Sequence, residues 1–211
     1  HYAADADSRD VVELLISHGA RIDAENQGGA TPLHLAAGKG HASLVRLLVL
    51  KEADVNANAE NGETPLHHAA RGGHEDVVLF LMENGADTQA MSKGGRTPLY
   101  AAVENGHEDI ARLLLEHGAK VSSVDDLLYY AVSNGQRDLT ALFIEKGADA
   151  DSDAWGHTPA FYAAWNNHAD VLELLLAHGA NPNAKDRFDW TLLHYCYGTR
   201  GADMTRSLLN R

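Results

Sequence analysis

Three histidines and a glutamate lie close together in the segment HHAARGGHE, residues 67–75. Histidine is the commonest side-chain ligand of zinc, so His67, His68, His74 and Glu75 are the residue types of a metal site. Neighbouring side chains on a helix point in different directions, however, which makes His67 and His68 a poor chelating pair. The alternative is that these histidines recur along the chain for a structural reason.

A second candidate for metal chemistry is the string DADSDAWGH, in which Asp149, Asp151 and Asp153 imitate the first three ligand positions of an EF-hand calcium loop. That loop requires glycine at its sixth position and a bidentate glutamate at its twelfth. This chain has Ala154 and Ala160 there. Both requirements fail, so calcium binding is not expected.

The sequence offers no nucleophilic site either. Its single cysteine, Cys196, lies two residues after His194, so the two side chains point to different faces of a helix. A buried thiol of this kind is usually inert, and one cysteine excludes both an internal disulfide and a multi-cysteine zinc site. No nucleophile elbow, phosphate-binding loop or dinucleotide fingerprint occurs. The sequence therefore predicts a protein that is not an enzyme and has no cofactor.

The acidic balance of the chain limits its partners. The net charge is −13, and it divides almost evenly, with −7 over residues 1–105 and −6 over residues 106–211. Nucleic acids and anionic membranes need a patch of lysine and arginine, and no apolar run approaches the roughly 20 residues that cross a bilayer. Neither nucleic acid nor membrane is expected as a partner.

One heptapeptide motif recurs along the chain. Its copies are TPLHLAA, TPLHHAA, TPLYAAV, DLLYYAV, TPAFYAA and TLLHYCY, beginning at residues 31, 64, 97, 126, 158 and 191. Successive starts are 33, 33, 29, 32 and 33 residues apart, and HYAA at the beginning of the chain is the end of another copy. The period accounts for eleven of the 13 histidines and leaves His68 and His157 outside it. Repetition thus explains His67 and His74, and no metal site is expected.

Each copy of the motif predicts the start of a short helix. Threonine is a favoured N-cap and proline is tolerated at the first helical position, as in Thr31 and Pro32. Asp126 is expected to cap the helix where threonine is missing. Apolar residues at spacings of three and four, such as Ile110 and Leu114, predict a second helix in each repeat. Helices of about nine residues are unstable alone, so stability must come from stacking.

These repeats resemble ankyrin repeats over essentially the whole chain. The resemblance implies an all-α solenoid of antiparallel helix pairs with projecting β-hairpin loops, forming a single domain over residues 1–211. Because the chain enters and leaves within a motif, we expect it to be part of a longer protein. The expected repeats are 1–25 (partial), 26–58, 59–91, 92–124, 125–152 (short), 153–185 and 186–211 (partial).

The resemblance also implies roles for individual residues. The motif histidine is expected to hydrogen-bond the capping threonine and the neighbouring hairpin. Asn56 and Asn183 resemble acceptors of asparaginyl hydroxylation, and the alternative for both is a structural hairpin asparagine. The short junction GAKVSSVDDLLYY, four residues below the period, predicts a stunted hairpin between Lys120 and Asp126.

Ankyrin arrays bind proteins through their hairpin tips and the inner faces of their first helices, so unusual residues at those positions are the candidate site. The position after the motif histidine and those three and four residues later share one helix face. Charged candidates along this expected concave stripe and its loops are Lys39, Arg71 and Arg96. The aromatic candidates are Tyr130, Tyr162, Trp165 and Tyr195 on the helices, and Trp155, Phe188 and Trp190 at hairpin tips.

The aromatic candidates gather near one end of the chain. Eight of the 14 aromatic residues, with all three tryptophans, lie between residues 155 and 197. Tryptophan and tyrosine dominate binding energies at interfaces, so this region predicts a hot spot. The alternative is that several of these rings only fill the core or seal a terminal repeat, and for Phe161 and Tyr197 that interpretation is preferred.

The resemblance therefore implies a protein–protein interaction module that binds a protein or peptide on its concave face. The alternative is the substrate-docking arm of a larger enzyme, or of a bacterial or viral effector, whose catalytic domain lies outside this sequence. An intracellular, cytoplasmic location is expected, in the host cytoplasm for a secreted effector. The chain itself is expected to be monomeric.

Overall fold

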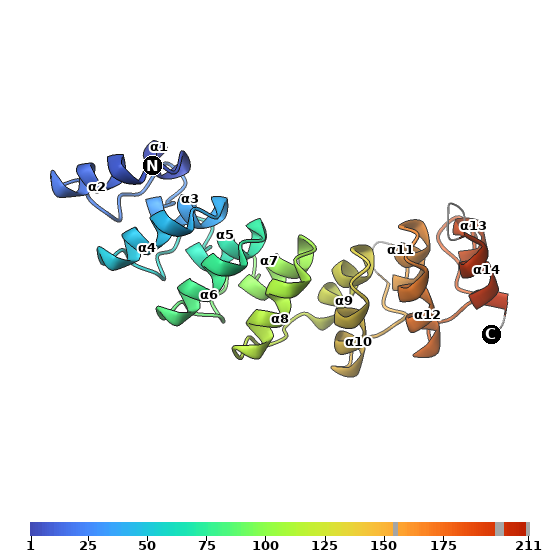
Figure 1. Cartoon of the computed structure of the whole chain (residues 1–211). Coiled ribbons are helices and arrows are strands. Elements are labelled where there is room, and N and C mark those ends of the chain that lie inside the picture. The colour runs from blue at the N-terminus through green and yellow to red at the C-terminus, as the bar shows by residue number, and fades with distance from the viewer. Residues whose placement is uncertain (154–155, 197–200, 210–211) are drawn as a thin grey trace. The chain divides into compact units, whose positions relative to one another are not determined.

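The computed structural model describes residues 1–153, 156–196 and 201–209. Contacts between residues divide the chain into two compact units, His1–Lys120 (unit 1) and Val121–Arg211 (unit 2). The division falls at the junction that the sequence predicts to be shortened. Each unit is built from pairs of short helices (Figure 1).

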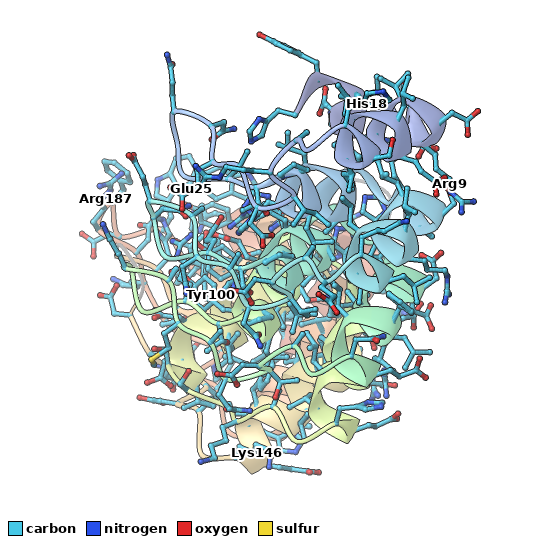
Figure 2. The ribbon with its side chains drawn as sticks, turned by 90° about the vertical axis from the view of Figure 1, so that its left-hand side faces the viewer. Arg9, His18, Glu25, Tyr100, Lys146 and Arg187 are labelled. Atoms are coloured by element: carbon cyan, nitrogen blue, oxygen red, sulfur yellow. The ribbon has the colours of Figure 1, made fainter. Side chains whose placement is uncertain are left out.

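Unit 1 contains four helix pairs. They are α1 (Tyr2–Asp5) with α2 (Arg9–Ser17), α3 (Pro32–Lys39) with α4 (Ala42–Leu50), α5 (Pro65–Gly72) with α6 (Glu75–Glu83), and α7 (Pro98–Glu104) with α8 (Glu108–Glu116). The first helices of the pairs contact one another in one row and the second helices in another (Figure 1). Figure 2 shows Glu25, in the loop before α3, and Tyr100, on α7, on one side of this unit, with Arg9 and His18 at the ends of α2 on the other.

Unit 2 repeats the arrangement. Its helices are α9 (Val124–Ser133), α10 (Arg137–Glu145), α11 (Pro159–Trp165), α12 (Ala169–Ala177), α13 (Leu192–Tyr195) and α14 (Gly201–Leu209). Helices α9, α11 and α13 form one row, and α10, α12 and α14 form the other. Within the described residues, none of the helices combines the length and the apolar character needed to cross a membrane.

The helices begin largely where the motif predicts. Thr31 caps α3, its backbone N–H donates to Nδ1 of His34 at 3.1 Å, and Pro32 is the first helical residue. Helix α9 differs, because its N-cap is Ser123, with φ of 51°, and Asp126 lies inside its first turn. The prediction that Asp126 caps this helix is wrong. Neither a proline nor a threonine–histidine capping box fixes the start at this place, and the helix therefore begins earlier.

The core lies between the two rows of each unit. Leucine side chains such as Leu66 and Leu99 in unit 1, and Phe143 and Phe161 in unit 2, are almost completely buried. Alanines at the small positions of the motif, such as Ala69, are also buried, which lets neighbouring first helices approach closely. Because no single helix is stable alone, this burial between repeats supplies most of the stability.

The motif histidines join neighbouring repeats. In fully buried His67, Nδ1 accepts the Thr64 backbone N–H at 3.1 Å and Nε2 donates to the Arg96 carbonyl at 3.0 Å. Burial lowers the pKa of His67, which keeps the ring neutral. His34 bonds its own threonine and the Glu63 carbonyl in the same way. Both ring nitrogens are thus used within the protein.

A second set of histidines packs against glycines of the preceding repeat. Nε2 of His74 donates to the Gly38 carbonyl at 3.1 Å, and Nε2 of His107 donates to the Arg71 carbonyl at 3.0 Å. Gly40 has φ of 73°, and a Cβ there would lie 2.4 Å from Nδ1 of His74. Both the backbone conformation and the packed ring therefore require glycine at this position.

The loops between repeats are tight turns that bond to one another. In unit 1 the Lys93 N–H donates to the Asn61 carbonyl, one repeat earlier, at 2.7 Å. Among the described residues, β-type pairing consists of isolated bridges, at His157 and, in antiparallel sense, between Lys185 and Thr191. The projecting hairpins that the sequence predicts are therefore present as turns with little regular strand pairing.

Asn56 also links two loops. Its Nδ2 donates to the Gly85 carbonyl at 2.9 Å, and its Oδ1 accepts the Asp87 N–H at 2.8 Å. For Asn183, the backbone N–H donates to Asn181 Oδ1 at 2.9 Å. A structural role for Asn56 is therefore present, and the hydroxylation of either residue stays a prediction.

Candidate partner-binding site

The predicted binding residues lie on both units, in two sets of different chemistry. The charged set lies in unit 1 and consists of Lys39 on α3, Arg71 on α5 and Arg96 in the loop before α7. The aromatic set in unit 2 consists of Tyr130, Tyr162, Trp165, Phe188, Trp190 and Tyr195. Trp155 lies outside the described residues. The two sets define one candidate surface on each unit.

Two positions of the repeat unit organise these surfaces: the residue just before the capping threonine and the residue seven after that threonine. In three repeats these positions are occupied by Glu63 and Arg71, by Arg96 and Glu104, and by His157 and Trp165. Each of the first two pairs joins an acidic and a basic residue. The acidic residue comes first in Glu63 and Arg71, and the basic one comes first in Arg96 and Glu104. The third pair consists of two rings whose centroids lie 6.3 Å apart.

The first charged pair is the more buried one. Arg71 holds the Glu63 carboxylate with both terminal nitrogens, with 2.8 Å between Nη1 and Oε2. The Glu63 side chain is only 10% exposed. The hydrogen bond from Arg71 lowers the pKa of Glu63 to about 2, so the pair is ionised at neutral pH. His68 lies beside it, and burial lowers its pKa to about 4, so this histidine is neutral.

The second charged pair is more open. Arg96 Nη1 donates to Glu104 Oε1 at 2.8 Å, and the Arg96 guanidinium lies over the Tyr100 ring at 4.8 Å from its centroid. Lys39 is exposed, with Nζ 3.9 Å from Asp5 Oδ1. Each predicted cation of unit 1 therefore already faces an acidic side chain of the same unit. Binding a partner through these residues requires part of that pairing to be exchanged.

Four residues of the aromatic set of unit 2 line a pocket. Trp165, Phe188 and Trp190 are 53%, 65% and 51% exposed, an unusual fraction for side chains of this size. Together with His194 and Tyr195 they line one open pocket. The pocket combines the end of α11 with the loop before α13 and with α13 itself. Two neighbouring repeats are thus needed to build it.

Tyr195 is the floor of this aromatic pocket. It is nearly buried, and its ring centroid lies 6.1 Å from that of Trp165 and 5.8 Å from that of Trp190. The Phe161 ring packs against it from the core at 5.3 Å. Trp190 also stacks on His194, with centroids 5.7 Å apart and an angle of 22° between the rings. The rings therefore hold one another in place.

A buried carboxylate fixes the loop that carries the pocket. Oδ1 of Asp186 accepts the backbone N–H groups of Phe188 and Trp190 at 2.8 and 2.9 Å, and Oδ2 accepts the Tyr195 hydroxyl at 2.6 Å. Burial alone would raise the pKa of Asp186, but these hydrogen bonds outweigh burial and lower it. The ionised Asp186 thus positions three of the aromatic side chains.

The remaining predicted residues, Tyr130 and Tyr162, belong to a neighbouring ring cluster. Tyr129 contacts both, with centroids 4.9 Å from Tyr130 and 4.6 Å from Tyr162. His157 connects this cluster to Trp165, because its ring also lies 5.8 Å from Tyr162. The structure therefore brings most of the aromatic set together along α9, α11 and α13.

The sequence did not predict the acidic residues that organise both surfaces, Glu63 and Asp186. A signal for them existed in the two histidines that lie outside the repeat period. Nε2 of His68 lies 3.5 Å from Glu63 Oε2, and Nε2 of His157 lies 3.7 Å from Asp186 Oδ2. Each irregular histidine thus marks a buried carboxylate.

The residues considered for metal or nucleophilic chemistry have ordinary structural partners. Asp149 and Asp153 accept the backbone N–H groups of Asp151 and Gly156 within their own loop. Burial raises the pKa of the Cys196 thiol, so this cysteine is un-ionised at neutral pH. These contacts explain the aspartates and the cysteine as parts of loops and of the helix packing.

Stacked helix pairs joined by histidines, with exposed side chains at fixed register positions, define a repeat protein whose surface varies on a constant scaffold. The family model described as Ankyrin repeats (3 copies) matches residues 1–92, 57–125 and 123–186, and the chain belongs to this family. The crystal structure of the human ASB11 ankyrin repeat domain is similar, with 26% identity and a TM-score of 0.78 over 100% of this chain and 96% of that one. A search of the curated proteins found no match.

Membership of this family indicates a general class of activity. Ankyrin repeats are generally protein–protein interaction modules, and their fold is typically non-catalytic. The all-α solenoid architecture that the sequence predicts is confirmed.

Proposed function

We propose that this chain binds a protein or peptide partner, and that the aromatic pocket of unit 2 anchors it. The observation that carries the proposal is the exposure of Trp165, Phe188 and Trp190 around one pocket. Large aromatic side chains clustered in this way are the residues that dominate binding energies at protein interfaces.

The aromatic pocket is also preorganised, which favours a binding role over simple sealing of the repeat end. Asp186 holds the loop, and Tyr195 separates the two indoles. Rings that are already fixed lose little conformational entropy when a partner docks. A sealing role would bury these rings against the protein's own core, as it does for Phe161.

The charged surface of unit 1 serves a second role in this proposal. Arg71 is held by Glu63 and Arg96 by Glu104, so neither offers an unpaired charge to a partner. Such groups affect the rate and orientation of docking more than the final affinity. The partner is a protein, and residues 1–211 act as one monomeric ankyrin-repeat domain with the repeat bounds that the sequence predicts.

The proposal is tested by affinity capture from native cells with three immobilised baits. They are the wild-type chain, a Trp165→Ala and Trp190→Ala double variant, and a Leu50→Ala and Leu209→Ala control that removes two even more exposed apolar side chains elsewhere. Proteins that the wild type and the control retain, but the tryptophan variant loses, support the proposal. Equal recovery on all three baits contradicts it.

A further inference from the structure

The aromatic pocket has a chemical character that narrows its ligand. We propose that it binds an alkylated ammonium group, such as a methylated lysine side chain of the partner. This inference rests on the proposed function and deepens it by naming the group that enters the pocket. It is carried by the rings that line the pocket, by the lack of free acceptors among them, and by the charge behind its floor.

The rings are arranged as walls and a floor. The ring centroids of Trp165 and Trp190 lie 6.1 and 5.8 Å from that of Tyr195. Phe188 also lines the pocket. A cation within about 6 Å of an aromatic face is attracted by the negative potential of that face, and indole is the strongest such partner. Several faces around one recess can therefore surround a single cationic group.

The lining side chains do not offer the acceptors that an unmodified ammonium needs. Nδ1 of His194 accepts the Thr191 N–H at 3.0 Å, so its other nitrogen carries the proton and donates. Indole N–H groups are donors as well. The Asp186 carboxylate is fully buried and already accepts three hydrogen bonds. A primary ammonium that enters this pocket would lose its hydrogen bonds to water and find no acceptors to replace them. A trimethylated ammonium has no N–H group that needs an acceptor.

The carboxylate behind the floor of the pocket favours a cation over a neutral apolar group. The ionised Asp186 lies directly behind Tyr195 and accepts its hydroxyl, which makes the ring more electron-rich. On the same loop, Lys185 is paired with Asp189, with 3.4 Å between Nζ and Oδ1. Arg187 carries the local positive charge and lies over Phe188 at 5.0 Å from the ring centroid.

This chain already places guanidinium groups on other aromatic faces. Besides Arg187 on Phe188, Arg46 lies over Phe80 at 4.5 Å, on the second helices of unit 1. Within the described part of the chain, no such group lies over Trp165 or Trp190. Trp165 and the face of Trp190 that does not stack on His194 therefore remain for a ligand, and the net charge of −13 favours a basic partner segment.

The inference is tested with three single-residue probes titrated into the whole chain and followed by indole N–H NMR signals. They are capped trimethyl-lysine, capped lysine, and the capped neutral isostere in which carbon replaces the quaternary nitrogen. Trimethyl-lysine is expected to bind at least about tenfold more tightly than either of the others. Trp165→Ala and Trp190→Ala are each expected to weaken it by about tenfold, and Leu209→Ala to leave it unchanged.

A second variant protects the test against misfolding. Tyr195→Phe keeps the floor of the pocket but removes the bond to Asp186, and it is expected to reduce the preference for trimethyl-lysine over the neutral isostere. Equal binding of these two probes to the wild type, or no saturable shift with any probe, overturns the inference. The proposed function fails independently, when partner capture survives the tryptophan substitutions.

Discussion

In two repeats of unit 1 the residue before the capping threonine and the residue seven after it are oppositely charged, as in Glu63 with Arg71. In unit 2 the same two positions hold the rings of His157 and Trp165. The backbone at these positions is held by the repeated pattern of hydrogen bonds, for example from His34 to the Glu63 carbonyl. The comparison teaches that the scaffold fixes where side chains are presented, and that the chemistry presented there varies between units.

The two surfaces also differ in what remains for a partner. Arg71 and Arg96 of unit 1 are paired with Glu63 and Glu104 of the same unit, whereas Trp165 and Trp190 of unit 2 expose half of their surface. Exposed surface that a partner can bury contributes more affinity than an ion pair that must be exchanged. We therefore expect unit 2 to dominate binding.

The largest expected effect comes from His67→Ala in unit 1. The Thr64 N–H and the Arg96 carbonyl lose their buried partner, which is expected to lower the free energy of unfolding by about 3 kcal/mol. His194→Ala is the matched control in unit 2. His194 is exposed and hydrogen-bonds only its own threonine within the described residues, so a loss below about 1 kcal/mol is expected. Urea unfolding measures the free energy of unfolding of both variants. Equal decreases would contradict the expectation that the buried histidine contributes more than the exposed one.

Asp186→Ala is expected to follow in size, and it acts on the pocket of unit 2. It leaves the Phe188 and Trp190 N–H groups and the Tyr195 hydroxyl without their acceptor. We expect partner binding to fall by about tenfold or more, because the rings lose their fixed positions. Asp186→Asn keeps an acceptor oxygen and is expected to lose less. Binding of the captured partner measures both variants, and unchanged binding by Asp186→Ala would show that the carboxylate does not position the pocket.

The buried pair of unit 1 is expected to give a pH dependence of stability. The pKa of Glu63 falls from an ordinary 4.5 to about 2 on folding. Its contribution is therefore fully present above about pH 4.5 and is lost as the pH falls toward 2. We expect the free energy of unfolding to fall by about 1–2 kcal/mol across this pH window, because solvent around the partly exposed Arg71 weakens the ion pair.

Glu63→Gln supplies the control for that measurement. The variant should not show the decrease in the free energy of unfolding that Glu63 causes between pH 4.5 and 2. It should keep the decrease below pH 6.5 that follows from the lowered pKa values of His34 and His67. Urea unfolding across this range separates the two. Parallel curves for the wild type and the variant would show that the pair with Arg71 contributes nothing.

The smallest effect is expected at Lys39. Its contact with Asp5 is long and exposed, so Lys39→Ala should change the free energy of unfolding by no more than about 0.5 kcal/mol. It should also leave partner binding nearly unchanged. A large loss of binding at Lys39 would move the principal contact from unit 2 to unit 1.

The sequence predicts the scaffold well because the repeat multiplies weak local signals. Threonine caps, glycine helix ends and paired leucines recur at one period, and six copies agree in phase. Where a copy lacks proline and the Thr–His capping box, at Asp126, the prediction of the helix start fails. Local rules are reliable here only while the repeat reinforces them.

The candidate site was less accessible to the sequence. Register places Trp165, Trp190 and Tyr195 on one surface, and the structure shows them in contact through Tyr195. The role of Asp186 depends on a loop conformation and on a hydroxyl nine residues away, and no periodic pattern encodes either. Glu63 and Arg71 stand at two fixed positions of the repeat, but the period alone does not show that their side chains meet.

The most direct test measures the dissociation constant of the captured partner for two variants side by side. The Trp165→Ala and Trp190→Ala double variant removes the walls of the aromatic pocket, and an Arg96→Ala and Glu104→Ala double variant removes the open charged pair. The account predicts a loss of about 30-fold or more for the first and of less than about threefold for the second. The reverse order, or equal losses, would contradict the claim that unit 2 carries the binding site.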